Sequence, residues 1–480
     1  MKSIAKSLLV GLLFVSSMFI ISCSDDEMTD IVPFGVAFET TAIGIQNGAN
    51  SVIVRVTFTN TTTVANQIRI GLTESGVVYG DDYVTTPAAV SGMLTLDVPV
   101  GTSAYSFEVE RIGDAIVEGS SVNFSLESVT GEEETVISGN TSIDVSFSAV
   151  ASAGASLVAE IGGAAQPNQV FVDFSLNTQT TAERVSWDLG LSNGSADQVI
   201  LNFSTYSMAY ELEANDISAV TAADTAGLAG TVVIGTAGAH IYIDHPDGDM
   251  DKLAIANVSE TDDDNKVYII NRGAGPGTGD VTPGSVDVGS VPRGWKKVRI
   301  LKRGDSYLIQ HADIASTEFS ETIISRSSGY NFSYFSFEST SAVAVEPVAA
   351  DWDIVFSVSS NIINFGRGDG AYGFSDFVKS NRQGGVMVAR IALDTEEDGT
   401  IIPGQTTYDD FTADDLDGVT FSEAANTIGS SWRSVFTRTA NSNVYFIIED
   451  AEGNRYKLQF LGLLNELGER GNSSFRYELL

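Results

Sequence analysis

Hydrophobic and polar residues alternate through the first third of the chain, between Phe34 and Phe147. A period of two is typical of strands that bury one face, and turns at Gly, Asn and Pro separate the runs. Candidate helices are almost absent. The pattern predicts an antiparallel β-sandwich over residues 33–149. The clearest alternating runs are 52–58, 94–100, 105–109 and 143–147.

A stretch of small residues ends this block. Residues 148–156 are mostly Ala, Ser and Gly, and residues 162–167 have the composition of a linker. We therefore expect a linker over residues 150–168 and a larger second domain over residues 169–480. Strand-like segments fill this second domain too, so the whole chain is predicted to be all-β. These segments include 170–176, 199–203, 232–234, 241–243, 267–270, 297–301, 354–358 and 444–448.

Two blocks of the second domain look alike. Trp187-Asp188-Leu189 leads on to Asn202-Phe203, and Trp352-Asp353-Ile354 leads on to Asn364-Phe365. The spacings differ by a few residues, as loop insertions between paired strands allow. The similarity indicates an internal pseudo-repeat of one β-unit.

Composition and charge narrow the class of protein. The 480 residues carry 63 Asp and Glu against 26 Lys and Arg, a formal net charge of −37. This excess repels phosphate backbones, so nucleic acid is not expected as a partner. Because 43% of residues are hydrophobic and only 19% charged, the chain is predicted to be folded and soluble. The single cysteine excludes an intrachain disulfide.

The first residues have the features of an export signal. Lys2 and Lys6 precede an apolar run from Leu8 to Ile21 that is too short to span a bilayer as a helix. The run ends in Ile21-Ser22-Cys23, which resembles the lipobox of bacterial lipoproteins, where the thiol receives the lipid. We therefore expect a signal peptide over residues 1–22 and lipidation at Cys23.

An acidic segment follows the cysteine. Ser24-Asp25-Asp26-Glu27 is similar to the tethers that route some lipoproteins to the outer face of the outer membrane. We expect an acidic tether over residues 23–32 and a lipid-anchored chain at the outer membrane that faces the cell exterior. The alternative is a plain solvated linker with no sorting role.

Acidic residues gather at the predicted turns of the first domain. Gly80-Asp81-Asp82-Tyr83, Val98-Pro99-Val100-Gly101 and the segment 113–119 together resemble the Calx-beta domain. In that family acidic residues at these turns bind calcium, a hard cation that prefers oxygen ligands. A sandwich that serves only as a spacer is the alternative, because Gln46-Asn47 stands where an acidic ligand is expected. The resemblance implies as calcium ligands Asp81, Asp82, Asp114 and Glu118.

Aromatic motifs recur through the second domain. They include Trp187-Asp188, Trp295-Lys296-Lys297-Val298, the segment 330–338, Asp351-Trp352-Asp353 and Tyr456-Lys457. Taken alone, such aromatics are core residues by default. Together, over about residues 166–480, they resemble the HmuY family of surface haem-binding lipoproteins. The resemblance implies a mostly-β domain that captures haem between β-elements and passes it to an outer-membrane receptor.

Haem iron in such proteins is held by His or Met. His240 and His245 flank the predicted strand 241–243, and strand alternation places their side chains on opposite faces. They could bind one iron together only if the strand ended in a turn, which Pro246 can supply at His245. The thioether of Met208 is a further donor, although core filling is the alternative role for this side chain. The three histidines are His240, His245 and His311. The candidate axial ligands are Met208, His240 and His245.

The sequence therefore predicts a binding protein and not an enzyme. No nucleophile elbow, zinc spacing or Ser/His/Asp arrangement stands out. The main expectation is a haemophore-like lipoprotein. The alternative is a surface adhesion or ligand-binding lipoprotein that does not bind haem. An enzyme acting on surface polysaccharide needs paired carboxylates in a cleft, and 63 acidic residues single out no pair.

Overall fold

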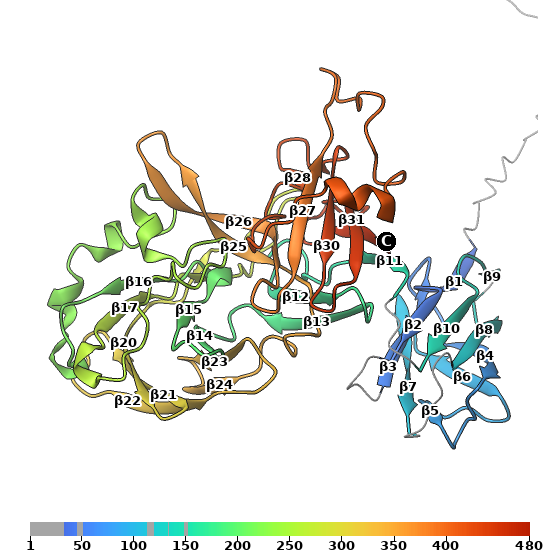
Figure 1. Ribbon diagram of the computed structural model, residues 1–480, viewed down its shortest axis with the longest axis horizontal. Helices are drawn as coiled ribbons and strands as arrows, with labels where there is room; N and C mark the ends of the chain where they lie inside the picture. Colours follow the sequence, from blue (N-terminus) through green and yellow to red (C-terminus); the bar gives the residue numbers. More distant parts are fainter. Residues whose placement is uncertain (1–32, 46–50, 113–119, 133, 148–151) are drawn as a thin grey trace, which may run out of the picture.

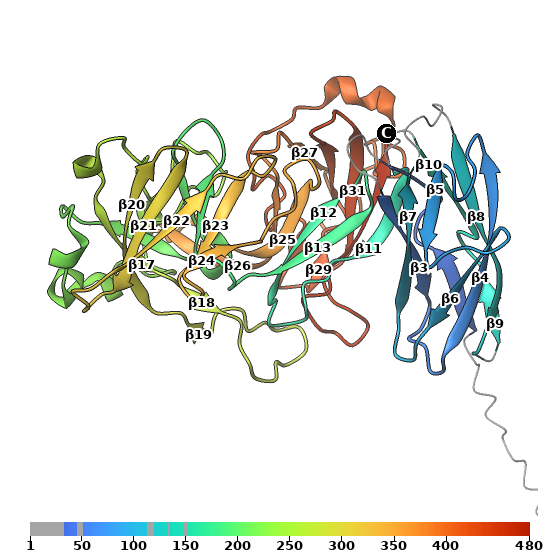
Figure 2. The same cartoon turned by 90° about the horizontal axis from the view of Figure 1, so that it is seen from below.

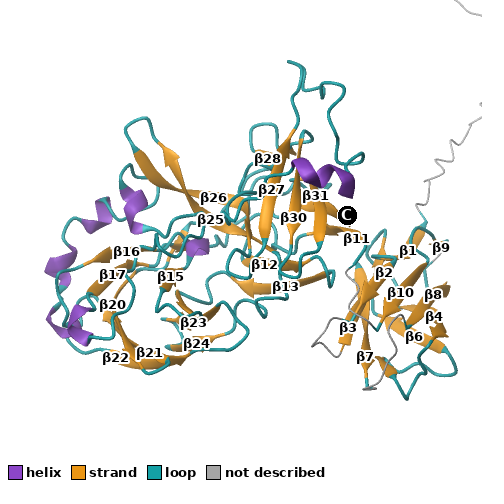
Figure 3. Cartoon of the chain, in the orientation of Figure 1, coloured by secondary structure: helices purple, strands orange, loops and turns teal. Residues whose placement is uncertain are grey.

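The computed structural model describes residues 33–45, 51–112, 120–132, 134–147 and 152–480. Strands make up nearly all the regular structure of these residues, and every helix among them is a 3₁₀ turn of three to six residues (Figure 3). The predicted all-β fold class is confirmed. The helices are η1 (Phe203–Thr205), η2 (Ile217–Ala219), η3 (Ala222–Thr225), η4 (Leu228–Gly230), η5 (Ala239–Tyr242), η6 (Asp262–Asp264) and η7 (Ala413–Gly418).

The amino-terminal strands form two five-stranded sheets that share one core. Alternate residues of each strand enter that core, as the period of two predicts, and the rings of Phe107 and Phe124 meet between the sheets with centroids 5.0 Å apart. The first sheet has the order β5 (Tyr83–Thr86), β7 (Ala104–Arg111), β3 (Ser51–Phe58), β1 (Phe34–Phe38), β9 (Thr135–Ile137). The second has the order β2 (Ala42–Gly44), β10 (Ser142–Ser146), β8 (Ser121–Thr130), β4 (Asn66–Ser75), β6 (Met93–Val98).

The rest of the chain contains two further five-stranded antiparallel sheets with matching strand order (Figures 1 and 2). One has the order β16 (Met208–Glu211), β17 (Val267–Asn271), β20 (Trp295–Arg303), β21 (Ser306–Asp313), β22 (Ser320–Ser325). The other has the order β27 (Met387–Ala392), β30 (Val444–Glu449), β31 (Arg455–Gly462), β32 (Ser474–Leu479), β11 (Gly154–Val158). The predicted linker 150–168 thus supplies a strand, β11, which completes the sheet formed by the end of the chain.

Two four-stranded sheets join the first half of the second domain (β12 to β22) to its second half (β23 to β32), because each sheet contains strands from both halves. In one, β12 pairs with β25, and in the other β14 pairs with β23. The first has the order β13 (Thr178–Glu183), β12 (Asn168–Asp173), β25 (Ile354–Asn364), β26 (Asp369–Ser380). The second has the order β15 (Val199–Leu201), β14 (Leu189–Ser192), β23 (Phe332–Ser336), β24 (Ser341–Val343). The small ribbons are β18 (Ala274–Gly275) with β19 (Val291–Pro292), and β28 (Arg433–Ser434) with β29 (Thr439–Ala440).

Side-chain contacts confirm the internal repeat but change its register. The Asn202 amide donates to the carbonyls of Arg184 and Trp187, and the Asn381 amide donates in the same way to Ala349 and Trp352. Asn381 is therefore the equivalent of Asn202, and the prediction that Asn364 plays this part is wrong. The reason is an extension of β25 and β26 into a long hairpin, whose exposed tip holds Asn364 (Figure 1).

Two short predicted strands are also wrong. Residues 241–243 lie in and just after the 3₁₀ helix η5, and residues 232–234 form bends and turns. Gly238, in the left-handed region with φ of 85°, begins η5, and its amide donates to the Asp369 carbonyl of β26. This contact with the long hairpin replaces strand pairing.

The sandwich contacts the rest of the chain near β11. Thr40 donates its hydroxyl to the Gly154 carbonyl, and the Asn177 amide donates to Glu39 at 3.3 Å. The Arg55 guanidinium lies 3.4 Å from Glu160 and 3.9 Å from Glu39. Burial of the Glu39 carboxyl at this junction raises its pKa.

Candidate functional site

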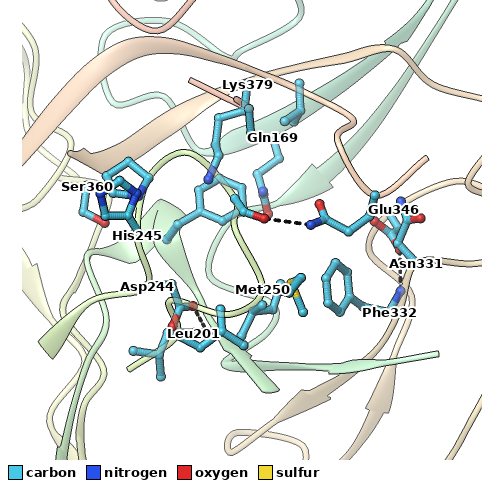
Figure 4. A pocket seen from close by; sticks show the side chains of 18 of the residues that line it. Gln169, Leu201, Asp244, His245, Met250, Asn331, Phe332, Glu346, Ser360 and Lys379 are labelled. Atoms are coloured by element: carbon cyan, nitrogen blue, oxygen red, sulfur yellow. Dashed lines mark hydrogen bonds between the residues drawn. The ribbon is translucent and has the colours of Figure 1, made fainter. Parts of the chain in front are cut away.

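A pocket lies where the two repeats meet (Figure 4). Its walls come from β12, β15, η1, β23, β25 and β26, together with the segment 243–253. The space between these walls, including the solvent at the mouth, is about 860 Å³. Each repeat supplies only part of the lining, so the pocket exists only when the mixed sheets have formed.

Aromatic side chains make up much of the wall. Phe171 and Trp352 meet edge to face with ring centroids 5.1 Å apart, and both are more than nine-tenths buried. Phe332 and Tyr334 of β23 and Phe203 of η1 complete this surface. The second Trp-Asp motif of the sequence therefore places its tryptophan in the lining of the pocket, where it adds apolar surface.

The loop that closes one side of the pocket is held by Asp244. Its two carboxylate oxygens accept the amides of Leu201, at 2.6 Å, and Ala254, at 3.0 Å. These bonds fix the segment 243–253 against β15, and burial raises the pKa of Asp244 to about 6. As a result His245 and Met250 of this segment both line the pocket.

The other acidic residue of the pocket is also used by the fold. Glu346 accepts the Phe332 amide at 2.8 Å and the Tyr334 hydroxyl at 3.0 Å. Burial raises its pKa to about 7. Both pocket carboxylates thus already have hydrogen-bond donors from the protein.

Lys379 is the pocket's basic side chain on β26. Its Nζ lies 4.4 Å from the centroid of the Phe203 ring, and burial lowers its pKa to about 8. Figure 4 shows Lys379 and Gln169 entering the pocket from one side and Met250 and Phe332 from the other. Neither Lys379 nor Met250 stands in a motif, so the sequence analysis missed both.

The structure separates the candidate haem ligands. His245 lines the pocket, and its Nδ1 lies 2.7 Å from the Asp247 carboxylate. Met208 is fully buried in a separate apolar cluster with Ile217 and Val267. The His240 Nδ1 lies 2.9 Å from the Asp369 carbonyl, outside the pocket lining. His311 is packed against the rings of Phe335 and Phe337. Only His245 of the predicted ligands therefore reaches the pocket.

The predicted calcium residues fall partly within the described chain. Asp81 and Asp82 lie in the turn before β5, where the Asp82 carboxylate accepts the Val78 amide at 2.8 Å. The amide of Ile112, the residue directly after β7, donates to the Asp82 carbonyl. Asp114 and Glu118 lie outside the described residues. Within the described ranges, no group of three His, Cys, Asp or Glu side chains is spaced to hold a metal.

The lipidation site and its surroundings also lie outside the described residues, which begin at residue 33. This applies to the signal peptide 1–22, to Cys23 and to the tether 23–32. From residue 33 onward, none of the described helices has the length and apolar character needed to cross a bilayer.

Comparison with known proteins identifies the family to which this architecture belongs. The fold and site define an internally repeated all-β protein with an aromatic pocket between its repeats. The family model described as HmuY protein matches residues 165–323 and again 328–477. The chain therefore belongs to the HmuY family. The two matched segments correspond to the two halves joined by the mixed sheets. No protein of curated function matches the sequence.

Similarities to solved structures are weak. The apo form of the Calx CBD1 domain matches 24% of this chain and 98% of its own, at 16% identity and a TM-score of 0.21. A two-domain protein of unknown function from Bacteroides fragilis matches 64% of this chain and 84% of its own, at 9% identity and a TM-score of 0.18. A putative carbohydrate binding protein from Bacteroides ovatus matches 72% of this chain and 97% of its own, at 9% identity and a TM-score of 0.17. Scores this low carry no conclusion about shared structure or function.

Proposed function

We propose that this chain is a surface lipoprotein that binds haem, without turnover, in the pocket between its two repeats. The observation that carries the proposal is an aromatic pocket with one imidazole in its lining, His245. Haem is flat and mostly apolar, so aromatic walls bury its macrocycle while a His or Met side chain holds the iron. Membership of the HmuY family supports the same ligand.

His245 fits the part of an iron ligand. Its Nδ1 faces the Asp247 carboxylate at 2.7 Å, which leaves Nε2 as the nitrogen for a metal. A carboxylate behind a ligating histidine fixes the ring and raises its basicity. Met250 lines the same pocket and supplies a thioether as a second donor. Met208 and His240, outside the lining, are not part of this proposal.

The location of the chain is a further part of the proposal. A lipid on Cys23 would hold the mature protein on the outer membrane, with the tether 23–32 leading to the folded region. An outer-membrane receptor would then take the haem from the pocket. The HmuY family supports a surface lipoprotein of this kind.

Haem titration of the full mature chain tests the proposal. We expect a Soret band shift with the wild-type protein, and loss or displacement of that band in His245→Ala. His240→Ala is the matched control, because it removes the same chemical group outside the pocket, and its spectrum should equal that of the wild type. A wild-type spectrum that is only that of free haem at micromolar concentration rejects haem binding and leaves the alternative, a lipoprotein for another small ligand.

A further inference from the structure

The pocket holds one positive charge, on Lys379, that forms no direct ion pair among the described residues, although the carboxylates of Asp244 and Asp247 lie near enough to favour its charged form. Both of its carboxylates are engaged, Asp244 by two backbone amides and Glu346 by an amide and a phenol. The Lys379 ammonium has no hydrogen bond or ion pair within the described part of the chain, and its close contact is the face of Phe203. A lysine among apolar walls normally requires an anionic partner, because loss of hydration is costly.

Two further hydrogen-bond donors belong to pocket-lining residues and have no partner among the described residues. Trp352 Nε1 and Ser380 Oγ belong to side chains that line the pocket, are more than nine-tenths buried and have no hydrogen-bond partner among the described residues. By contrast, the equivalent tryptophan of the first repeat, Trp187, donates its Nε1 to Gln169 at 2.7 Å. The pocket is therefore rich in unused donors, while its carboxylate acceptors are occupied.

The charge is particular to the second repeat. With Asn202 and Asn381 as equivalent positions, Lys379 corresponds to Ile200, which also lines the pocket. An apolar residue at one equivalent position and a lysine at the other make the two sides of the pocket chemically different. An amphipathic ligand with one charged edge suits this asymmetry.

We propose that Lys379 recognises a carboxylate of the bound ligand, with Trp352 Nε1 as a further unused donor in the pocket lining. The ligand class is a planar apolar molecule that carries an acidic group. This inference rests on the proposed function: if the ligand is haem, the carboxylates that Lys379 recognises are the haem propionates. The Lys379 ammonium and a carboxylate would form a partly buried ion pair, which contributes more than one in water.

Paired porphyrin probes test this inference on the full mature chain. The probes are metal-free protoporphyrin IX and its dimethyl ester. The affinity for each probe is measured from the quenching of tryptophan fluorescence. We expect the wild type to bind the diacid at least about tenfold more tightly than the diester. Lys379→Met should remove this preference while it keeps affinity for the diester. Lys266→Met, which changes a lysine outside the pocket lining, should keep the preference.

The outcomes separate the two proposals. Equal discrimination by wild type and Lys379→Met, or no binding of the diacid, overturns the role of Lys379. Binding of the diacid with the expected preference, but without a Soret shift on haem addition, supports the role of Lys379 and overturns haem as the ligand. A folded state unchanged in circular dichroism shows that Lys379→Met has not acted through unfolding.

Discussion

Asp188 and Asp353 occupy equivalent positions in the two repeats and have opposite electrostatic surroundings. Each accepts a backbone amide from the other repeat, Asp188 from Phe337 and Asp353 from Phe174. The Asp188 carboxylate also lies 2.9 Å from Arg272 and 3.0 Å from Arg293. Asp353 has no ion pair among the described residues, and burial together with nearby Asp173 raises its pKa well above the usual range.

Near Asp353, the position equivalent to Arg272 of the first repeat is occupied by an acidic residue, Asp450. Arg272 directly follows β17, whereas Asp450 directly follows the matching strand β30. Asp450 and Asp173 both add negative charge near Asp353. One repeat therefore neutralises its central aspartate with cations, while the other surrounds it with further carboxylates.

Substitution of the two aspartates should have opposite effects. Asp188→Asn keeps the acceptor for the Phe337 amide but leaves buried Arg293 without a carboxylate partner and Arg272 with only the exposed Glu338, so we expect a loss of about 3 kcal/mol in the free energy of unfolding. Asp353→Asn removes a group whose charge is unfavourable and should raise stability at pH 7.5. Urea unfolding of both variants measures the difference. Equal destabilisation by the two substitutions would contradict this account.

Stability should fall as the pH rises from about 4 to about 7. Burial raises the pKa of Asp173 to about 6 and of Glu346 and Glu452 to about 7, whereas unfolded carboxyls titrate near 4. The folded state therefore binds more protons than the unfolded state, and this contribution is lost as the pH passes the folded values. Urea unfolding at pH 5 and 7.5 measures it. Asp173→Asn should flatten the profile, and a stability that rises over this range would refute the prediction.

The corrected register of the repeat can be tested by three asparagine substitutions. Asn202→Ala and Asn381→Ala each remove two side-chain hydrogen bonds to backbone carbonyls, which should cost about 2 kcal/mol in stability. Asn364→Ala changes an exposed hairpin tip and should have an effect within about 0.5 kcal/mol. Thermal unfolding compares all three. A large effect of Asn364→Ala with a small effect of Asn381→Ala would restore the register expected from the sequence.

Calcium binding by the first domain remains a prediction. A cation held at the turn of Asp81 and Asp82 would raise the melting temperature of that domain, because a ligand bound only to the folded state stabilises it. The double substitution Asp81→Asn and Asp82→Asn should abolish the shift. As a control, Asp97→Asn removes an acidic residue on β6. A melting temperature indifferent to calcium and to chelator would leave the sandwich as a spacer.

The local pattern of hydrophobic, polar and aromatic residues was sufficient to predict the fold class, the internal repeat and the family. The alternation along strands such as β3 and β6 predicts which residues are buried, because side chains on a strand alternate between faces. The aromatic motifs around Trp187 and Trp352 marked the internal repeat and the family. These features depend on residues close in the chain, so the printed sequence is sufficient to find them.

Tertiary structure alone decided the site. β11 pairs with β32 at the far end of the chain, and the pocket joins Phe171, His245 and Lys379 from three separate segments. No local period encodes such pairings, since they depend on which apolar faces of distant strands fit together. The same holds for η5, where a contact with the long hairpin overrode a short apolar run. For this reason the sequence could propose three ligands, and only the fold could separate His245 from Met208 and His240.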